Sequence, residues 1–135
     1  MLVVQLDSGW YAAWSLFDFE GNNKYNHTDV RLSLEDWRDT RLLRIDIEEV
    51  ERVDSVDEDH NREWSYSSVT STAFCGVGAS GKPSCTARLT TRREEGSEAE
   101  GAKPRILEQR TLALQADKLR VTEAGQTKEH VLVFP

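Results

Sequence analysis

The acidic side chains of this sequence are concentrated in one short segment. Residues 46–63 hold nine acids and two bases, a local charge of −7, so the rest of the chain is neutral with 15 acids and 15 bases. Concentrated negative charge can steer a cationic protein or hold a divalent cation. We therefore take this segment as the first candidate site. Its predicted partner-binding residues are Glu48, Glu49, Glu51, Asp54, Asp57, Glu58, Asp59 and Trp64.

Within this segment, oxygen-bearing side chains recur at alternate positions, as they do in calcium-binding loops. An EF-hand begun at Asp57 is excluded, because Arg62 stands where glycine is required and Ser68 stands where glutamate is required. An irregular site is compatible with these residues, because calcium accepts irregular cages of oxygen ligands. The alternative is a solvated acidic edge that prevents strands from associating. The possible Ca²⁺ ligands are Asp54, Asp57, Asp59 and Asn61, and no other cofactor is predicted.

Cys75 and Cys85 are the only cysteines, and the residues between them are rich in glycine and serine and include a proline. Turn-forming residues between two strands favour a disulfide that closes the loop, with two reduced thiols as the alternative. A disulfide predicts a periplasmic or extracellular location. Because residues 1–5 do not resemble a signal peptide, that location requires a leader that has been removed. A cytoplasmic protein is the alternative.

No catalytic motif is complete. Residues 76–82 have the glycine spacing of a phosphate-binding loop, but Pro83 stands where Ser or Thr must hold magnesium. No Gly-x-Ser-x-Gly elbow occurs, and His27, His60 and His130 share no catalytic or metal-binding spacing. We therefore predict that the protein is not an enzyme and name no catalytic residue.

Composition argues against two classes of partner. The formal net charge is −7 and the chain has no basic stripe, whereas nucleic-acid binding depends on Lys and Arg that neutralise phosphates. No apolar run approaches the ~20 residues that a membrane-spanning helix needs. We therefore expect a protein partner that is basic, or self-association, with no nucleic acid and no membrane span.

Apolar and polar residues alternate along most of the chain, and no window sustains a helical period. Strands are predicted at residues 9–19, 29–35, 41–53, 64–74, 86–92, 105–115, 119–123 and 128–134. This pattern predicts one all-β domain over residues 1–135, an antiparallel barrel or sandwich of seven or eight strands with meander connections. We expect the polar segment 94–104 to be a mobile loop. The two apolar ends of the chain are predicted to pair and close the barrel.

In size, cysteine use and predicted architecture, the chain is similar to the small disulfide-linked β-barrels that inhibit lysozymes in bacterial envelopes. The similarity concerns fold and composition, and it assigns no binding residue.

Three hypotheses of function follow from these patterns. The first is a non-enzymatic binding or assembly module that contacts a basic partner through the acidic segment. The second is a structural subunit that assembles through its edge or terminal strands. The third is a calcium-stabilised domain or an inhibitor-like protein.

Overall fold

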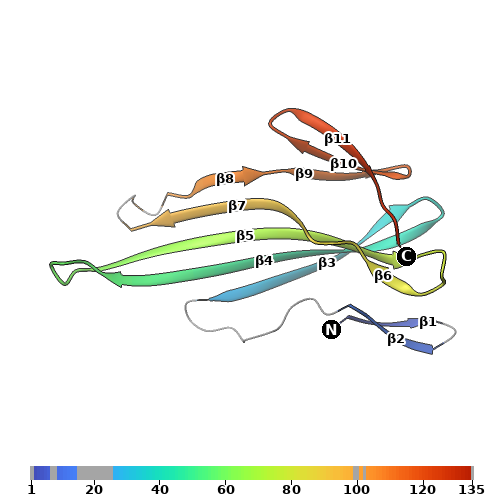
Figure 1. Cartoon of the computed structure of the whole chain (residues 1–135), viewed down its shortest axis with the longest axis horizontal. Coiled ribbons are helices and arrows are strands. Elements are labelled where there is room, and N and C mark those ends of the chain that lie inside the picture. The colour runs from blue at the N-terminus through green and yellow to red at the C-terminus, as the bar shows by residue number, and fades with distance from the viewer. Residues whose placement is uncertain (1, 7–8, 15–25, 99–100, 102, 135) are drawn as a thin grey trace.

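The fold is described from a computed structural model of the chain (Figure 1). The structure describes residues 2–6, 9–14, 26–98, 101 and 103–134, and for residues 2–14 only the backbone. These residues form eleven strands and no helix, and every strand pairing is antiparallel. The described part therefore contains no helix that is long and apolar enough to cross a membrane. The prediction of an all-β, antiparallel protein is confirmed.

The strands form three sheets. In chain order they are β1 (Leu2–Leu6), β2 (Gly9–Trp14), β3 (His27–Trp37), β4 (Thr40–Val56), β5 (Arg62–Val77), β6 (Pro83–Cys85), β7 (Leu89–Ser97), β8 (Arg105–Gln109), β9 (Thr111–Gln115), β10 (Lys118–Glu123) and β11 (Gln126–Val131). The main sheet has the order β3-β4-β5-β7-β8, with β6 attached to β5. The other two sheets are the hairpin β1-β2 and the meander β9-β10-β11.

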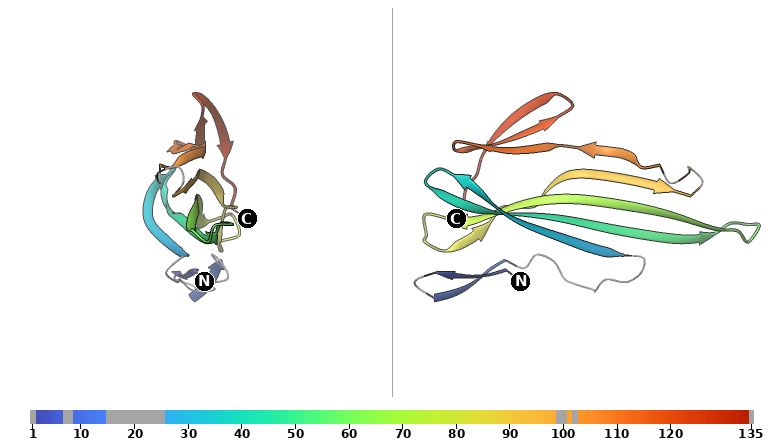
Figure 2. Two further views of the ribbon diagram at one scale, coloured as in Figure 1. Left: turned by 90° about the vertical axis from the view of Figure 1, so that its left-hand side faces the viewer. Right: turned by 180° about the vertical axis from the view of Figure 1, so that it is seen from behind.

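The main sheet has two chemically different faces, because successive side chains of a strand point to opposite sides. On β4, Leu42, Arg44 and Asp46 share the face that we call inner, and Ile45 and Ile47 share the opposite face. Seen end-on, this sheet is curled rather than flat (Figure 2). The curl brings β3 near β9, but no ladder joins them among the described strands, so the main sheet stays open.

Two apolar clusters hold this assembly together at one end. The first lies on the inner face, where the β9–β11 sheet packs against it, and consists of Trp37, Leu42, Phe74, Leu112 and Leu119. Gly76 is necessary to this packing, because a Cβ there would lie 2.6 Å from Cδ2 of Leu42. The second cluster, on the opposite face, consists of Ile45, Ile47 and Cys75. The β9–β11 sheet thus gives a sandwich over only part of the main sheet.

The number of strands and the closure of the barrel differ from the predictions. The predicted strand 105–115 is broken at Arg110, whose guanidinium bonds the carbonyl oxygen of Thr90 at 3.1 Å and pairs with Glu123 at 3.1 Å. Consequently β8 pairs with β7, whereas β9 leaves the main sheet and pairs with β10. The chain ends do not pair with each other, since β1 pairs with β2 and β11 pairs with β10. Each end forms a local hairpin, which has a lower loop-closure cost than pairing across the whole chain.

Residues 94–97 are not a loop, contrary to the prediction for 94–104. They continue β7, which pairs with β5 on one side and with β8 on the other. Their acidic side chains have cationic partners on the sheet, because Glu94 pairs with Arg92 at 2.6 Å and Glu95 pairs with Arg105. Of the remaining predicted loop, residues 99–100 and 102 lie outside the described residues.

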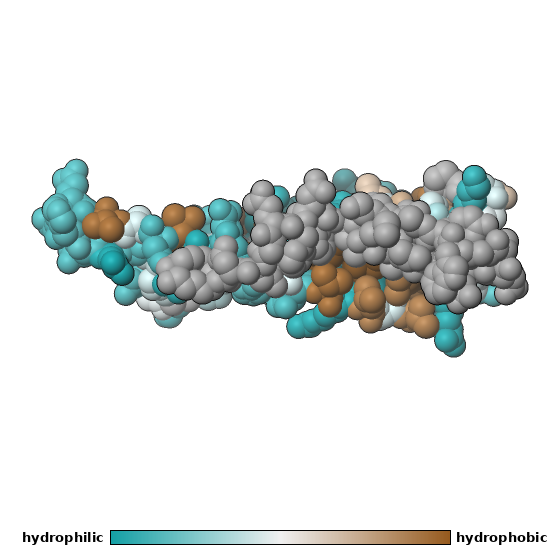
Figure 3. All heavy atoms as spheres, turned by 90° about the horizontal axis from the view of Figure 1, so that it is seen from below, coloured by the Kyte–Doolittle hydropathy of each residue, from teal (hydrophilic) through white to brown (hydrophobic). Residues whose placement is uncertain are grey.

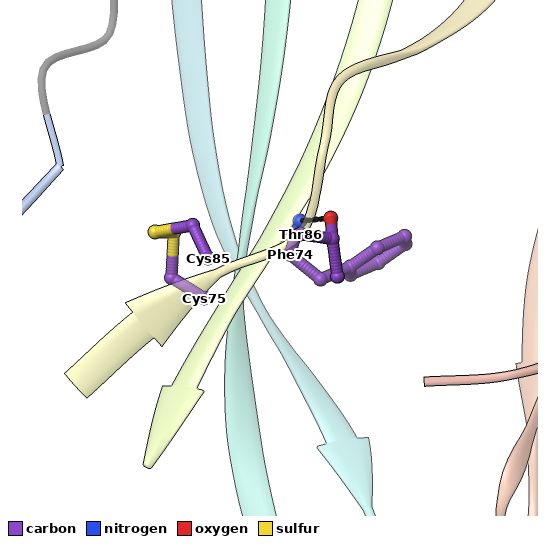
Figure 4. The surroundings of a disulfide bond; sticks show 4 residues. All are labelled: Phe74, Cys75, Cys85 and Thr86. Atoms are coloured by element: carbon purple, nitrogen blue, oxygen red, sulfur yellow. Dashed lines mark hydrogen bonds between the residues drawn. A yellow bond between two sulfur atoms is a disulfide. The ribbon is translucent and has the colours of Figure 1, made fainter. Parts of the chain in front are cut away.

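The predicted disulfide is confirmed. Cys75 on β5 lies directly opposite Cys85 on β6, with an S–S distance of 2.02 Å (Figure 4). Next to it, the N–H of Phe74 donates to Oγ1 of Thr86 at 3.1 Å, and the N–H of Thr86 donates to the carbonyl oxygen of Phe74 at 2.8 Å. This reciprocal pair precedes the start of β7 at Leu89, later than the predicted residue 86.

Removal of the disulfide tests how much it stabilises this end of the sheet. For the double variant Cys75→Ser/Cys85→Ser, we expect the free energy of unfolding to fall by about 2–3 kcal/mol, because the open loop gains entropy in the unfolded chain. The melting temperature should then fall by about 6–10 °C. Ser84→Ala in the same strand is the control, since the buried Ser84 hydroxyl has no hydrogen-bond partner among the described residues. Equal melting temperatures for the double variant and the wild type would contradict the prediction.

Candidate functional site

The β4–β5 hairpin extends beyond the other strands of the main sheet (Figure 1). The ladder of β3 with β4 ends where His27 faces Val50, and the ladder of β7 with β5 ends where Ser97 faces Ser65. We call residues 51–64 the acidic arm. Every residue from 51 to 63 is exposed, so this part of the hairpin contributes nothing to either apolar cluster. Viewed from below, the arm end of the molecule is largely hydrophilic (Figure 3).

The acidic arm carries the main surplus of negative charge. Residues 51–63 include six acids and two bases, a net charge of −4. Four of these acids form no ion pair within the described part of the chain, and they are Glu51, Glu58, Asp59 and Glu63. The carboxylate of Asp54 is neutralised locally, since it accepts a bond from Nε of Arg52 at 3.0 Å.

Two predicted partner-binding residues lie outside the arm and on different faces. Glu48 points to the inner face, where it accepts a hydrogen bond from the hydroxyl of Ser68 at 3.2 Å. Glu49 points to the opposite face, where it pairs with Arg88. The structure therefore brings Glu51, Asp54, Asp57, Glu58, Asp59 and Trp64 together on the arm, and separates Glu48 and Glu49 from them.

The tip of the arm is organised by the carboxylate of Asp57. Its Oδ1 accepts bonds from the backbone N–H groups of Asp59 at 3.0 Å and Asn61 at 2.8 Å, and its Oδ2 accepts from Nδ2 of Asn61 at 3.0 Å. His60 has a positive φ of 64°, which completes the reversal of the chain. The side-chain bond from Asn61, followed by the backbone bonds, holds the pKa of Asp57 below its ordinary value.

These bonds give the proposed calcium ligands another role. The oxygens of Asp57 bind N–H groups within the turn, and Asp54 lies on the strand beside Arg52. Among the described residues, no three His, Cys, Asp or Glu side chains are placed to hold a metal ion. A calcium site formed by Asp54, Asp57, Asp59 and Asn61 therefore stays a prediction with no support from the geometry.

Aromatic side chains form a ladder at the base of the arm. The guanidinium of Arg52 lies 5.0 Å from the ring centre of Trp64, and this ring stacks on Tyr66 with centroids 6.3 Å apart. Tyr66 lies over Gly96, where a Cβ would be 2.6 Å from its Cε1. Both aromatic side chains are only partly buried, so their remaining surface is accessible to a partner. An exposed cation–π contact stabilises by about 0.5–1 kcal/mol.

Sequence reasoning identified Trp64 and missed the rest of this ladder. Trp64 and Tyr66 are two positions apart on a predicted strand, a spacing that places both on one face. Arg52 and Gly96 could be added only from the pairing of strands, because they lie opposite Tyr66 on β4 and β7.

A polar hollow of about 560 Å³ lies on the inner face, between β3, β4, β5, β7 and the start of β9. On its floor, Asp46 accepts bonds from Nε of Arg44 at 3.0 Å and from the hydroxyl of Thr72 at 2.5 Å. Its charged lining is balanced, with four acids and four bases: Asp29, Asp46, Glu48, Glu94, Arg31, Arg44, Arg92 and Arg110. Because of this balance, the hollow has no net attraction for a ligand of either charge, whereas the acidic arm attracts positively charged groups.

Comparison with known proteins assigns neither a family nor a function to the chain. No protein-family model matches the chain, and no curated protein or solved structure shows significant similarity to it.

The low pKa of Asp57 gives the tip a defined acid sensitivity. Because the folded pKa is lowered from 3.8, the turn bonds contribute stability fully above pH 3.8 and lose it as pH falls further through the folded value. An NMR titration of the Asp57 carboxyl checks this shift. Asn61→Ala should raise the pKa of Asp57 toward 3.8, whereas the control Ser55→Ala should leave it unchanged. An unshifted pKa in Asn61→Ala would contradict this account of the turn.

The aromatic ladder depends on the missing side chain at residue 96. In Gly96→Ala, the new Cβ must displace the ring of Tyr66, and we expect the stack with Trp64 to be disrupted. The free energy of unfolding should fall by about 1 kcal/mol from overpacking. Ring-current shifts of the two aromatic side chains measure the stack. Ser97→Ala on the same strand is the matched control, and unchanged shifts in Gly96→Ala would disprove the contact.

Proposed function

We propose that this protein is a non-enzymatic binding module that contacts a basic protein partner through the acidic arm. The observation that supports the proposal is the arm itself, a projecting hairpin with a net charge of −4 and no buried residue from 51 to 63. Because all residues from 51 to 63 are exposed, packing in the core does not explain why six of them are acidic. Their exposure suits recognition of a partner with the opposite charge.

The four carboxylates that form no ion pair with the described residues are the groups that such a partner would meet first. Complementary charge mainly raises the rate of association and selects the partner, and its effect weakens as salt screens it. Trp64 and Tyr66 supply the apolar contact area at the base of the arm. Partly exposed aromatic side chains are typical of the few residues that carry most of the binding energy.

The partner is proposed to be met outside the cytoplasm. Disulfides persist in oxidising compartments and are rare where thiols are kept reduced. The Cys75–Cys85 bond therefore favours a periplasmic or extracellular location for this binding module. The negative arm also disfavours a nucleic-acid partner, because phosphates would be repelled.

A structural subunit that assembles through an edge strand is the second candidate function. β3 is one of the two edge strands of the main sheet, and its apolar side chains Val30, Leu32 and Leu34 are 40%, 59% and 63% exposed. Apolar side chains are also visible on the underside of the molecule (Figure 3). A row of exposed apolar residues along an edge strand is a surface through which sheets associate.

Binding of a fluorescent oligolysine peptide tests the role of the arm. We expect the affinity to fall at least about tenfold between about 50 mM and about 500 mM salt, because the attraction is electrostatic. At low salt, Glu58→Gln/Glu63→Gln should weaken binding about three- to tenfold, and Trp64→Ala about fivefold or more.

The matched control removes two acids from turns outside the arm, one in the main sheet and one in the β9–β11 sheet. Asp39→Asn/Asp117→Asn alters exposed turn residues between β3 and β4 and between β9 and β10. It changes the net charge by the same amount as the arm variant, so binding should stay near the wild-type value. Equal effects of the two double variants, or equal affinity at both salt concentrations, would rule out the arm as the binding surface.

A further inference from the structure

The outer edge of β4 along the acidic arm has no partner among the strands that the structure describes. Among the described strands, β3 is the only one beside this edge, and its ladder stops at His27. Asn26 then closes the ladder, since its Oδ1 accepts the backbone N–H of Arg52 at 3.2 Å. Beyond Arg52, the edge continues to Val56 with β5 on its other side.

Alternation of the backbone decides which groups this edge presents. The N–H of Asp57 donates to the carbonyl oxygen of Asn61, across the hairpin. In an antiparallel ladder the backbone groups of alternate residues point to opposite edges, so the N–H and C=O groups of the odd-numbered residues of β4 in the arm point toward β5. The N–H of Arg52 points the other way, toward Asn26. The N–H and C=O groups of Asp54 and Val56 therefore point outward, as do those of any unpaired sheet edge.

The side chains along the edge define the chemistry of a strand that could pair with it. Val53 and Val56 are 52% and 61% exposed, and they offer apolar contacts on the two faces. Glu51 precedes these valines on β4, Glu58 and Asp59 follow them in the turn, and none of the three acids has an ion pair to a described residue. A second copy of the arm would place acids against acids, so this edge disfavours self-pairing and favours a strand that carries basic residues.

We propose that the outer edge of β4 from Arg52 to Val56 binds an extended, basic segment of the partner by strand addition. The backbone of the segment pairs with Asp54 and Val56, and its apolar residues contact Val53 and Val56. Its Lys or Arg side chains meet the carboxylates of the arm. In this mode, main-chain hydrogen bonds supply affinity and alternate side chains supply specificity. The inference rests on the proposed function, because it specifies how the acidic arm holds its basic partner.

Amide hydrogen exchange with a peptide of alternating lysine and valine tests the pairing. In the free protein, the amides of Asp54 and Val56 should exchange rapidly, and those of Val53 and Ser55, which face β5, should exchange slowly. Saturation with the peptide should slow exchange at Asp54 and Val56 by at least about tenfold. The same peptide with proline at its centre should protect them much less, because proline has no N–H to donate.

A variant of the edge provides a second readout. Val56→Pro removes an outward N–H while keeping the charge of the arm and its bonds to β5, and it should weaken peptide binding about fivefold or more relative to the control Val56→Ala.

The outcomes separate this inference from the proposed function. Salt-sensitive peptide binding without protection of Asp54 and Val56, or equal binding by Val56→Pro and Val56→Ala, would overturn strand addition and leave the acidic arm as a binding surface. Protection of both amides before peptide is added would also overturn it, because the edge would already be occupied. Absence of peptide binding by the wild type would overturn both proposals.

Discussion

The backbone ladder between β4 and β5 is the interaction on which the rest of the structure depends. It runs from Leu43, opposite Cys75, to Val56, opposite Arg62. β3 pairs with one side of this hairpin, and β6 and β7 pair with the other. The β9–β11 sheet packs on its inner face through Leu42 and Phe74. Because the ladder is longer than any neighbouring one, part of it has no neighbours, and the acidic arm is that part.

The strands could be predicted from the sequence where alternation is local. Alternating residues placed strands at 29–35, 41–53 and 64–74, all of which lie within β3, β4 and β5. The turn-forming residues between Cys75 and Cys85 likewise indicated the disulfide. The break at Arg110 could not be predicted, because it depends on Thr90 and Glu123, which are distant in the sequence. The same limit explains why the chain ends were wrongly expected to pair.

In the candidate site too, some features could be predicted from neighbouring residues, and others depend on residues distant in the sequence. The concentration of acids was visible in the sequence, and so was the prominence of Trp64. Successive side chains of a strand point to opposite faces, so Glu48 and Glu49 could already be separated from the sequence. Their shared charge nevertheless suggested a single surface. The projection of the arm and the place of Gly96 beneath Tyr66 required the registers of β3, β5 and β7. Register is set by packing and turns far from the residues concerned, so composition does not reveal it.

Both apolar clusters and the disulfide lie at the end of the main sheet away from the arm. The residues that maintain folding and those of the proposed binding surface are therefore different residues, joined by the continuous strands β4 and β5. Substitutions in the arm can accumulate without crossing the stability threshold that limits most sequence change. Such a division allows partner preference to diverge quickly among descendants of one ancestral sequence while the scaffold stays the same.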